Sequence, residues 1–225
     1  MSQRPSVQFY GRSSYPALTA QQAFDQSQRG QFPAKSLEEA APNLNLLVTD
    51  TQKKRVEDYL IKEFLPFCVE QYKVGNKEKY AMPQEDVDKL IAAIQGDPAN
   101  AEYNIPFKIL SDKSAELAPE AVGVVKVMGA KGTDFVLKAA VHNENELADP
   151  MSDVLKFPCI LLLEETTHEF YPGCVIGLKV VAYSYYNGKR PGVSLSADTL
   201  VWRADADRFG GGAGDVDEDE FFLID

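Results

Sequence analysis

Two long segments with alternating side chains flank the dipeptide Asn187-Gly188, and they constrain the fold more than any other feature of the sequence. Asn-Gly is strongly favoured in two-residue hairpin turns, because both turn positions need positive φ angles. Residues 174–186 and 192–203 are therefore predicted to pair as an antiparallel hairpin. Side chains of the first segment alternate between an apolar face and a mixed face. The apolar face holds Ile176, Leu178, Val180 and Ala182, and the mixed face holds Lys179, Val181, Tyr183 and Tyr185.

Shorter patterns predict further strands before this hairpin, with helices between the early ones. Helical periodicity covers residues 52–72, where Pro66 should kink the helix or end its first part. A second helix should run from Pro83 to Gly96. Residues 11–16 are expected to bend the chain after its first strand. The predicted class is mainly β with helical insertions, as a five-stranded β-barrel, with a β-sandwich as the alternative. The predicted strands before the hairpin are 7–10, 44–48, 106–110, 122–128, 133–141 and 157–163.

The mixed face of the hairpin combines aromatic rings with basic side chains. Unpaired bases stack on aromatic rings whatever their identity, while Lys and Arg neutralise the phosphates. A duplex hides its base faces, so this face predicts binding of a single strand. The alternative is a tyrosine-rich sheet that binds nothing, in which Trp202 belongs to the core. The predicted DNA-binding residues here are Lys179, Tyr183, Tyr185, Tyr186, Lys189, Arg190, Trp202 and Arg203.

The charge of the chain is unevenly distributed. The net charge of −11 over 225 residues would by itself disfavour a nucleic-acid partner. However, residues 215–225 hold six acids and no base, whereas residues 179–208 hold five bases and three acids. A net positive segment within an acidic chain is typical of a binding face accompanied by a tail of opposite sign.

The end of the chain is predicted to be a disordered tail. Residues 209–214 are rich in glycine and suit a flexible linker. One domain should therefore span residues 1–208, with a helical insertion at about 50–96, and residues 209–225 should form the linker and the acidic tail. Acids followed by apolar residues suit a peptide that docks on a basic pocket of another protein, or that occupies the chain's own groove in place of phosphates. The candidate partner-binding residues are Asp217, Glu218, Asp219, Glu220, Phe221 and Phe222.

Motifs for catalysis are absent, so we expect a binding protein without a cofactor rather than an enzyme. The sequence has no phosphate-binding loop, no GxSxG and no HExxH. Its three cysteines and two histidines show no metal-ligand spacing and suit reduced thiols in a cytosol. A nuclease-type cluster of the acids and histidine within residues 164–169 is disfavoured, since adjacent carboxylates on a strand point to opposite faces. We expect no membrane segment. The alternative function is a structural or scaffold protein of a virion.

The order of these features is similar to that of the single-stranded DNA-binding proteins of tailed bacteriophages, including the T7-like type. The similarity is strongest over residues 171–212, from Tyr171-Pro172-Gly173-Cys174 through the hairpin to Arg208-Phe209-Gly210-Gly211. A weaker match covers Gly11-Arg12-Ser13-Ser14-Tyr15-Pro16 and residues 44–72.

This resemblance implies an OB-fold that coats single-stranded DNA in phage replication, recombination and repair. It implies that the tail recruits phage replication proteins, namely a polymerase, helicase or primase. It also implies that Arg12 and Tyr15 belong to the DNA-binding surface. We further expect the protein to act in the cytoplasm of the infected bacterial host, and a homodimer is one option for its assembly.

Overall fold

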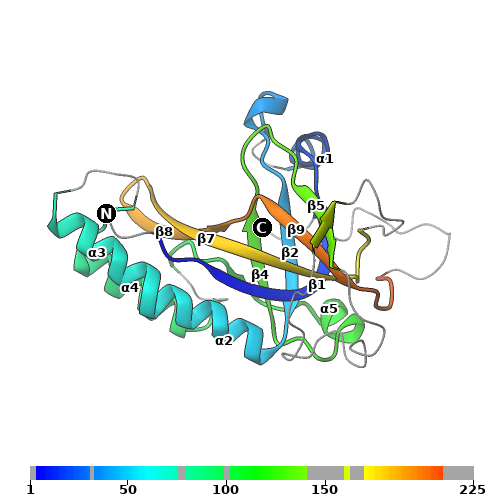
Figure 1. Cartoon of the computed structure of the whole chain (residues 1–225). Helices are drawn as coiled ribbons and strands as arrows, with labels where there is room; N and C mark the ends of the chain where they lie inside the picture. The colour runs from blue at the N-terminus through cyan, green and yellow to red at the C-terminus, as the bar shows by residue number, and fades with distance from the viewer. Residues whose placement is uncertain are drawn as a thin grey trace.

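The structure is a computed structural model that describes residues 4–30, 33–75, 80–98, 102–140, 160–162 and 170–209, with the backbone alone described at residues 15, 139, 140 and 160–162. This part of the chain folds into one sheet with helices around it (Figure 1). The strands are β1 (Val7–Ala17), β2 (Asn43–Val48), β3 (Phe107–Lys108), β4 (Gly123–Met128), β5 (Val136–Ala140), β6 (Ile160–Leu162), β7 (Val175–Asn187), β8 (Arg190–Ser196) and β9 (Thr199–Ala204). The helices are α1 (Ala20–Ser27), the 3-10 helix η1 (Leu37–Glu39), α2 (Asp50–Tyr59), the π-helix η2 (Leu60–Phe64), α3 (Leu65–Lys73), α4 (Gln84–Gln95) and α5 (Asp112–Leu117).

Five strands pair in a closed circuit, in the order β1-β2-β4-β8-β7 with β7 returning to β1. Neighbours in the circuit are antiparallel except β4 and β8, which run parallel. The length of β7 makes the closure possible, because residues 175–180 pair with β1 and residues 181–187 pair with β8. The described strands thus form one continuous sheet around a common interior, as predicted for an OB-fold-like arrangement, and not the two stacked sheets of a sandwich.

The remaining strands extend this circuit. β9 follows β8 and pairs with the first part of β7, and β5 and β6 continue the sheet beyond β9. β3 lies outside this strand order and pairs with β4. The predicted single strand at 192–203 is therefore wrong as one unit, since the chain leaves β8 after Ser196 and starts β9 at Thr199.

The helical segment forms one long helix with a second helix beside it (Figure 1). Thr49 caps α2, its side chain accepting a hydrogen bond from the backbone N–H of Gln52. Pro66 is predicted to kink this helix or to end its first part, and it lies in the first turn of α3, directly after η2. In η2 the chain widens, and the N–H of Leu65 bonds to the carbonyl of Leu60. The shifted hydrogen-bond register just before Pro66 accommodates a residue that has no N–H to donate. α4 begins after Pro83 and ends at Gly96, as predicted.

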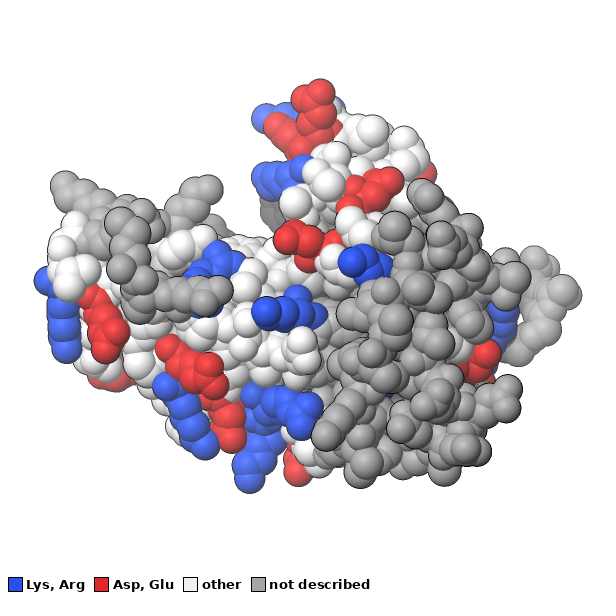
Figure 2. All heavy atoms as spheres, viewed as in Figure 1, with Lys and Arg blue, Asp and Glu red and all other residues white. Residues whose placement is uncertain are grey.

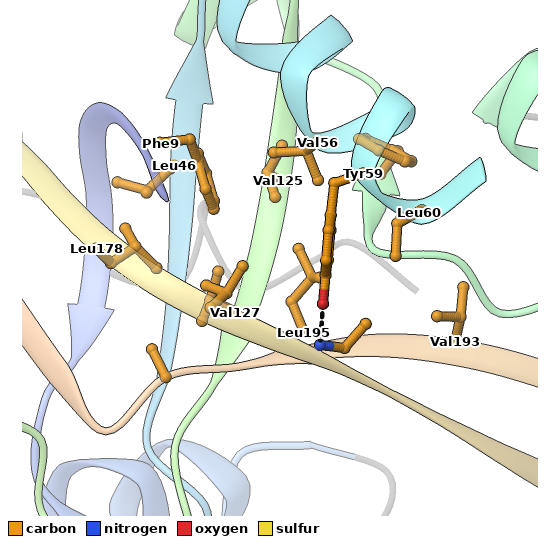
Figure 3. Packing of buried hydrophobic residues seen from close by; sticks show 14 of the residues in the cluster. Phe9, Leu46, Val56, Tyr59, Leu60, Val125, Val127, Leu178, Val193 and Leu195 are labelled. Atoms are coloured by element: carbon orange, nitrogen blue, oxygen red, sulfur yellow. Dashed lines mark hydrogen bonds between the residues drawn. The ribbon is translucent and has the colours of Figure 1, made fainter. Parts of the chain in front are cut away.

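The interior of the circuit is apolar and is covered by the helices. Side chains from β1, β2, β4, β7 and β8 point towards α2 and η2, and all those labelled in Figure 3 are buried. Tyr59 of α2 is buried among these side chains. Its hydroxyl accepts a hydrogen bond from the N–H of Ala182 (2.9 Å) and donates one to the carbonyl of Pro5 (2.9 Å). β1 pairs with β7 only as far as Val180, and Tyr59 provides a partner for the N–H of Ala182, two residues further along β7.

Two further differences from the sequence prediction concern the N-terminal part. The expected bend at residues 11–16 is wrong, because β1 continues to Ala17 with a register shift between Ser14 and Ala17. Helix α1 was not predicted, although Thr19 and Gln22 form a capping box that the sequence spells out as T-x-x-Q. No helix in the described part of the chain is both long enough and apolar enough to span a membrane.

Candidate nucleic-acid interface

The outward-facing side chains of β7 and β8 form a continuous surface, which we call the outer face. It consists of Lys179, Val181, Tyr183 and Tyr185 on β7 and of Ser194 and Ser196 on β8. None of these six side chains is fully buried, whereas their neighbours Ile176, Leu178, Val180, Ala182, Val193 and Leu195 lie in the core. The predicted alternation of β7 is therefore confirmed. At about 3.3 Å per residue, the row from Lys179 to Tyr185 is about 20 Å long.

Tyr183 and Tyr185 form an aromatic pair on this face. Their ring centroids are 5.9 Å apart and the ring planes are inclined by 37°. Tyr185 pairs with Gly192 of β8, and a Cβ atom at Gly192 would lie 2.8 Å from Cζ of the Tyr185 ring. The ring thus covers the glycine, and this burial raises the pKa of Tyr185, with a smaller contribution from Tyr183. The glycine gives the sheet a flat aromatic surface.

The hairpin turn places two cations at one end of the outer face. The predicted hairpin is present, but its two-residue turn is Gly188-Lys189, one residue later than Asn187-Gly188, because Asn187 still belongs to β7 and pairs with Arg190. Gly188 adopts φ +62°, and Lys189 and Arg190 are exposed. Tyr186 lies on the opposite side of the hairpin, where its hydroxyl donates a hydrogen bond to Asp86 of α4 (2.7 Å). Burial and this bond raise the pKa of Tyr186. Tyr186 therefore fastens the hairpin to the helices and does not extend the Tyr183–Tyr185 pair.

Trp202 and Arg203 lie inside the protein, although the sequence suggested an aromatic ring beside a base on the surface. Trp202 pairs with Ile176 and belongs to the main core, the alternative that the sequence left open. Arg203 is 1 % exposed, and its guanidinium stacks 3.8 Å from the ring centroid of Tyr10. Trp202 therefore packs in the core and Arg203 is covered by Tyr10, so neither side chain is available on the surface.

Arg12 is also buried, at 6 % exposure, and it holds the end of the domain together. Its guanidinium donates hydrogen bonds to the carbonyls of Gly173 (3.0 Å), Leu117 (3.1 Å) and Asp207 (2.5 Å) and stacks on Phe209. Arg12 also forms an ion pair with Glu120 (3.5 Å), so its buried guanidinium is engaged within the protein and is not presented on the outer face. Tyr15 lies in β1, where the structure describes its backbone alone.

Two lysines that the sequence analysis did not single out share this side of the sheet. Lys138 on β5 pairs with Val201, and Lys126 on β4 pairs with Asn45. Burial lowers the pKa of Lys126, and nearby Lys108 lowers it further. The alternation of residues 133–141 contains the signal for Lys138. Phe135 is buried in the core, and Lys138, three residues later, falls on the opposite side of the strand, away from the core.

The charges of the helices and of this sheet surface are organised differently. Three helical lysines are paired with nearby carboxylates: Lys53 with Glu57, Lys62 with Asp58, and Lys89 with Glu85 and Asp86. By contrast, Lys138, Lys179, Lys189 and Arg190 make no ion pair with the residues that the structure describes. Figure 2 shows basic side chains surrounded by uncharged surface in the area that β7 crosses in Figure 1. An acidic protein can thus present free cations where its own acids do not neutralise them.

A pocket of about 410 Å³ opens beyond Val181, at the end of the outer face away from the hairpin turn. It lies where β5, β7 and the β8–β9 connection meet, and both Lys138 and Lys179 line it. Val181 and Val201 are among its apolar lining residues, and among the residues that the structure describes Asp198 is the one carboxylate that lines it.

Several predicted residues fall outside the described part of the chain. These include the whole tail, with Asp217, Glu218, Asp219, Glu220, Phe221 and Phe222, and the acids and histidine considered as a metal cluster at 164–169. Within the described residues, no group of three or more His, Cys, Asp or Glu is arranged to hold a metal ion.

Comparison with solved structures relates this fold to one group of proteins. The structure resembles single-stranded DNA-binding proteins of bacteriophages. The protein from bacteriophage Enc34 is 16 % identical, with 96 % of this chain and 89 % of that chain covered at a TM-score of 0.48. The same Enc34 protein in complex with single-stranded DNA is 14 % identical over 91 % and 89 % of the chains, at 0.45. Gp2.5 of bacteriophage T7 is 12 % identical over 95 % and 99 %, at 0.46.

Sequence comparison adds nothing to this result, because no family model and no curated protein matches the chain. With TM-scores below 0.5, the solved structures supply no residue assignments here. The candidate surface is therefore described from the chain's own side chains.

Proposed function

We propose that this chain binds single-stranded DNA, without sequence preference, along the outer face of β7 and β8. The observation that carries this proposal is the Tyr183–Tyr185 pair, whose rings lie 5.9 Å apart on an open sheet surface. Lys179 continues the same row, and Lys189 and Arg190 stand at the hairpin turn, all three without a carboxylate partner among the described residues.

The chemistry of this surface suits unpaired bases. Each base presents a flat face that can stack on a tyrosine ring, which contributes about 1–3 kcal/mol per base regardless of sequence. The unpaired cations attract the phosphates, and neutralising them releases counterions from the strand. A duplex offers phosphates but no free base faces, so the tyrosines discriminate in favour of a single strand.

We extend the proposal to the cellular role that such binding serves. By coating exposed single strands, the protein acts in phage DNA replication, recombination and repair. The tail supports this role through its composition, since six acids and the apolar run Phe221-Phe222-Leu223-Ile224 suit a docking peptide for replication proteins.

The test compares long oligo-dT with a duplex of equal length, using fluorescence anisotropy at several salt concentrations. Oligo-dT should bind more tightly, and its affinity should fall with salt with a logarithmic slope of about −0.7 for each phosphate neutralised. Tyr183→Ala and Tyr185→Ala should each weaken binding by about 1–3 kcal/mol. Tyr72→Ala is the matched control, because Tyr72 is an exposed tyrosine (54 %) on helix α3. Equal affinity for both DNA forms would reject the proposal, and a virion scaffold protein would ignore oligo-dT altogether.

The role of the tail needs its own variant. Deletion of residues 215–225 should tighten DNA binding at low salt, because an acidic competitor for the same cations is removed. It should also abolish capture of a replication protein that the full chain binds. If the deletion changes neither property, the proposed tail function is wrong while DNA binding by the outer face still stands.

A further inference from the structure

The pocket at the end of the outer face has two lysines on neighbouring parts of the sheet. Lys179 stands on β7 and Lys138 on β5, and both line the same 410 Å³ space. That volume lies within the range of about 300–1,000 Å³ that is typical of small-ligand pockets. Lys138 pairs with Val201 on β9, so the register of the sheet fixes this lysine beside the apolar part of the pocket.

The composition of the pocket suits a nucleotide more than a purely apolar ligand. Val181 and Val201 provide an apolar surface on which a ring can lie, and Val201 is only 7 % exposed. Ser196 and Thr199 add hydroxyl groups that can hydrogen-bond a base edge or a sugar. The two lysines pair with no carboxylate of the described residues, so their charges are available to a phosphate.

The pocket is continuous with the tyrosine pair. Val181 lies between Tyr183 and Lys179 on the outward-facing row of β7, and it lines the pocket. Two residues along a strand span about 6.6 Å, so a chain stacked on Tyr185 and Tyr183 is led into the pocket by the next positions of the same row.

We propose that this pocket holds one nucleotide of the single strand that stacks on Tyr183 and Tyr185, with its base against Val181 and Val201 and its phosphate between Lys138 and Lys179. This inference rests on the proposed DNA-binding function and adds a defined end to the binding track. It assigns Lys138, a residue outside the hairpin, to the DNA-binding surface. The track then runs from the β7–β8 turn along the outward-facing row of β7 and ends at the pocket, beside Lys138 of β5.

The first experiment measures the salt dependence of oligo-dT binding by the full chain. Lys138→Gln should lower affinity and reduce the magnitude of the logarithmic salt slope by about 0.7, as expected for the loss of one phosphate contact. Lys62→Gln removes the same charge from the helical side, where Lys62 is paired with Asp58, and serves as the matched control. The loss with Lys138→Gln should appear with long oligo-dT and vanish with oligomers too short to reach beyond the tyrosines.

The second experiment observes the pocket directly through the methyl NMR signals of Val181 and Val201. Both should shift on binding long oligo-dT, because a base placed against them adds ring-current fields. Free thymidine monophosphate distinguishes a strand site from a site for free nucleotides. If the mononucleotide saturates these shifts as readily as the long oligomer does, the pocket is an independent nucleotide site and the inference is wrong.

The outcomes separate this inference from the function on which it rests. If the unmodified chain fails to bind oligo-dT, the proposed function itself is wrong. If the chain binds oligo-dT but Lys138→Gln behaves like Lys62→Gln and the valine methyls do not shift, only the pocket assignment is overturned. Denaturation midpoints of both lysine variants confirm that the comparison is made on folded protein.

Discussion

The ring of Tyr185 lies across Gly192 of the adjacent strand, so closely that a Cβ atom on Gly192 would stand 2.8 Å from the ring's Cζ. A glycine in a strand usually weakens a sheet, because it offers no side chain for packing. Here the missing side chain makes room for an aromatic ring, and the ring in turn covers the exposed backbone. The flat surface proposed to receive bases thus depends on both residues.

Gly192→Ala should weaken oligo-dT binding, because the added methyl group displaces the Tyr185 ring from its position. The ring end is flexible, so the fold should survive the substitution. A double-mutant cycle measures the coupling: in a Tyr185→Ala background, Gly192→Ala should have no further effect on affinity. Additive losses of affinity would show that Gly192 acts on binding independently of Tyr185.

Tyr59→Phe should destabilise the protein by about 1–3 kcal/mol, because it leaves the buried N–H of Ala182 and the carbonyl of Pro5 without their partner. Urea denaturation followed by circular dichroism measures the loss. Tyr72→Phe removes a hydroxyl from an exposed tyrosine and should leave the midpoint nearly unchanged. An equal effect of the two substitutions would contradict the structural role of the Tyr59 hydroxyl.

Stability should fall as the pH rises above about 9. Burial raises the pKa of the Cys68 thiol from its ordinary value of 9.0 to about 12 and that of Tyr59 from 10.0 to about 12. The unfolded chain therefore releases these protons first, so the stability is complete below pH 9 and is lost as the pH approaches 12. Cys68 alone should contribute a slope of about 1.4 kcal/mol per pH unit in this range.

Urea midpoints between pH 8 and about 11 test this dependence by comparison with Cys68→Ala. The variant is less stable at pH 8, since it loses a buried side chain, but its stability should decline less steeply above pH 9. If the urea midpoints of the unmodified chain and of Cys68→Ala fall equally with pH, the Cys68 thiol does not contribute to the alkaline loss of stability.

Arg12→Lys should lower stability without altering the salt dependence of DNA binding. A lysine cannot reproduce the planar set of donors that Arg12 directs to Gly173, Leu117 and Asp207, and hydrogen bonds to a charged group contribute about 1.5–3 kcal/mol each. Denaturation measures the first effect and anisotropy titrations at several salt concentrations measure the second. A smaller salt slope with unchanged stability would instead place Arg12 on the DNA.

Asp198→Asn should strengthen oligo-dT binding, most clearly at low salt. Asp198 is exposed and lines the pocket together with Lys138 and Lys179, so its carboxylate repels a phosphate held there. Asp205→Asn, an exposed acid beyond β9, removes the same charge for comparison. Equal gains from the two substitutions would mean that only the net charge matters and not the position of the carboxylate.

Local patterns in the sequence predicted the orientation of the side chains on the outer face correctly. Asn187-Gly188 predicted the β7–β8 hairpin, although the observed turn is Gly188-Lys189, and strict alternation decides which side each residue of β7 faces. For this reason the outward positions of Lys179, Tyr183 and Tyr185 followed from the sequence, as did the long helical segment and the mainly β class. These properties depend on neighbours within a few residues or across one short turn.

The sequence by itself therefore determined the hairpin, its two faces and the acidic composition of the tail. Only the tertiary structure decided that Arg12, Trp202 and Arg203 are interior, that Tyr186 bonds to α4, and that Lys138 joins Lys179 at one pocket. The physical reason is that burial and proximity depend on closure of the β1-β2-β4-β8-β7 circuit and on the bend between β8 and β9. Both bring together segments that are far apart in the chain, and no periodicity along a single strand records such contacts.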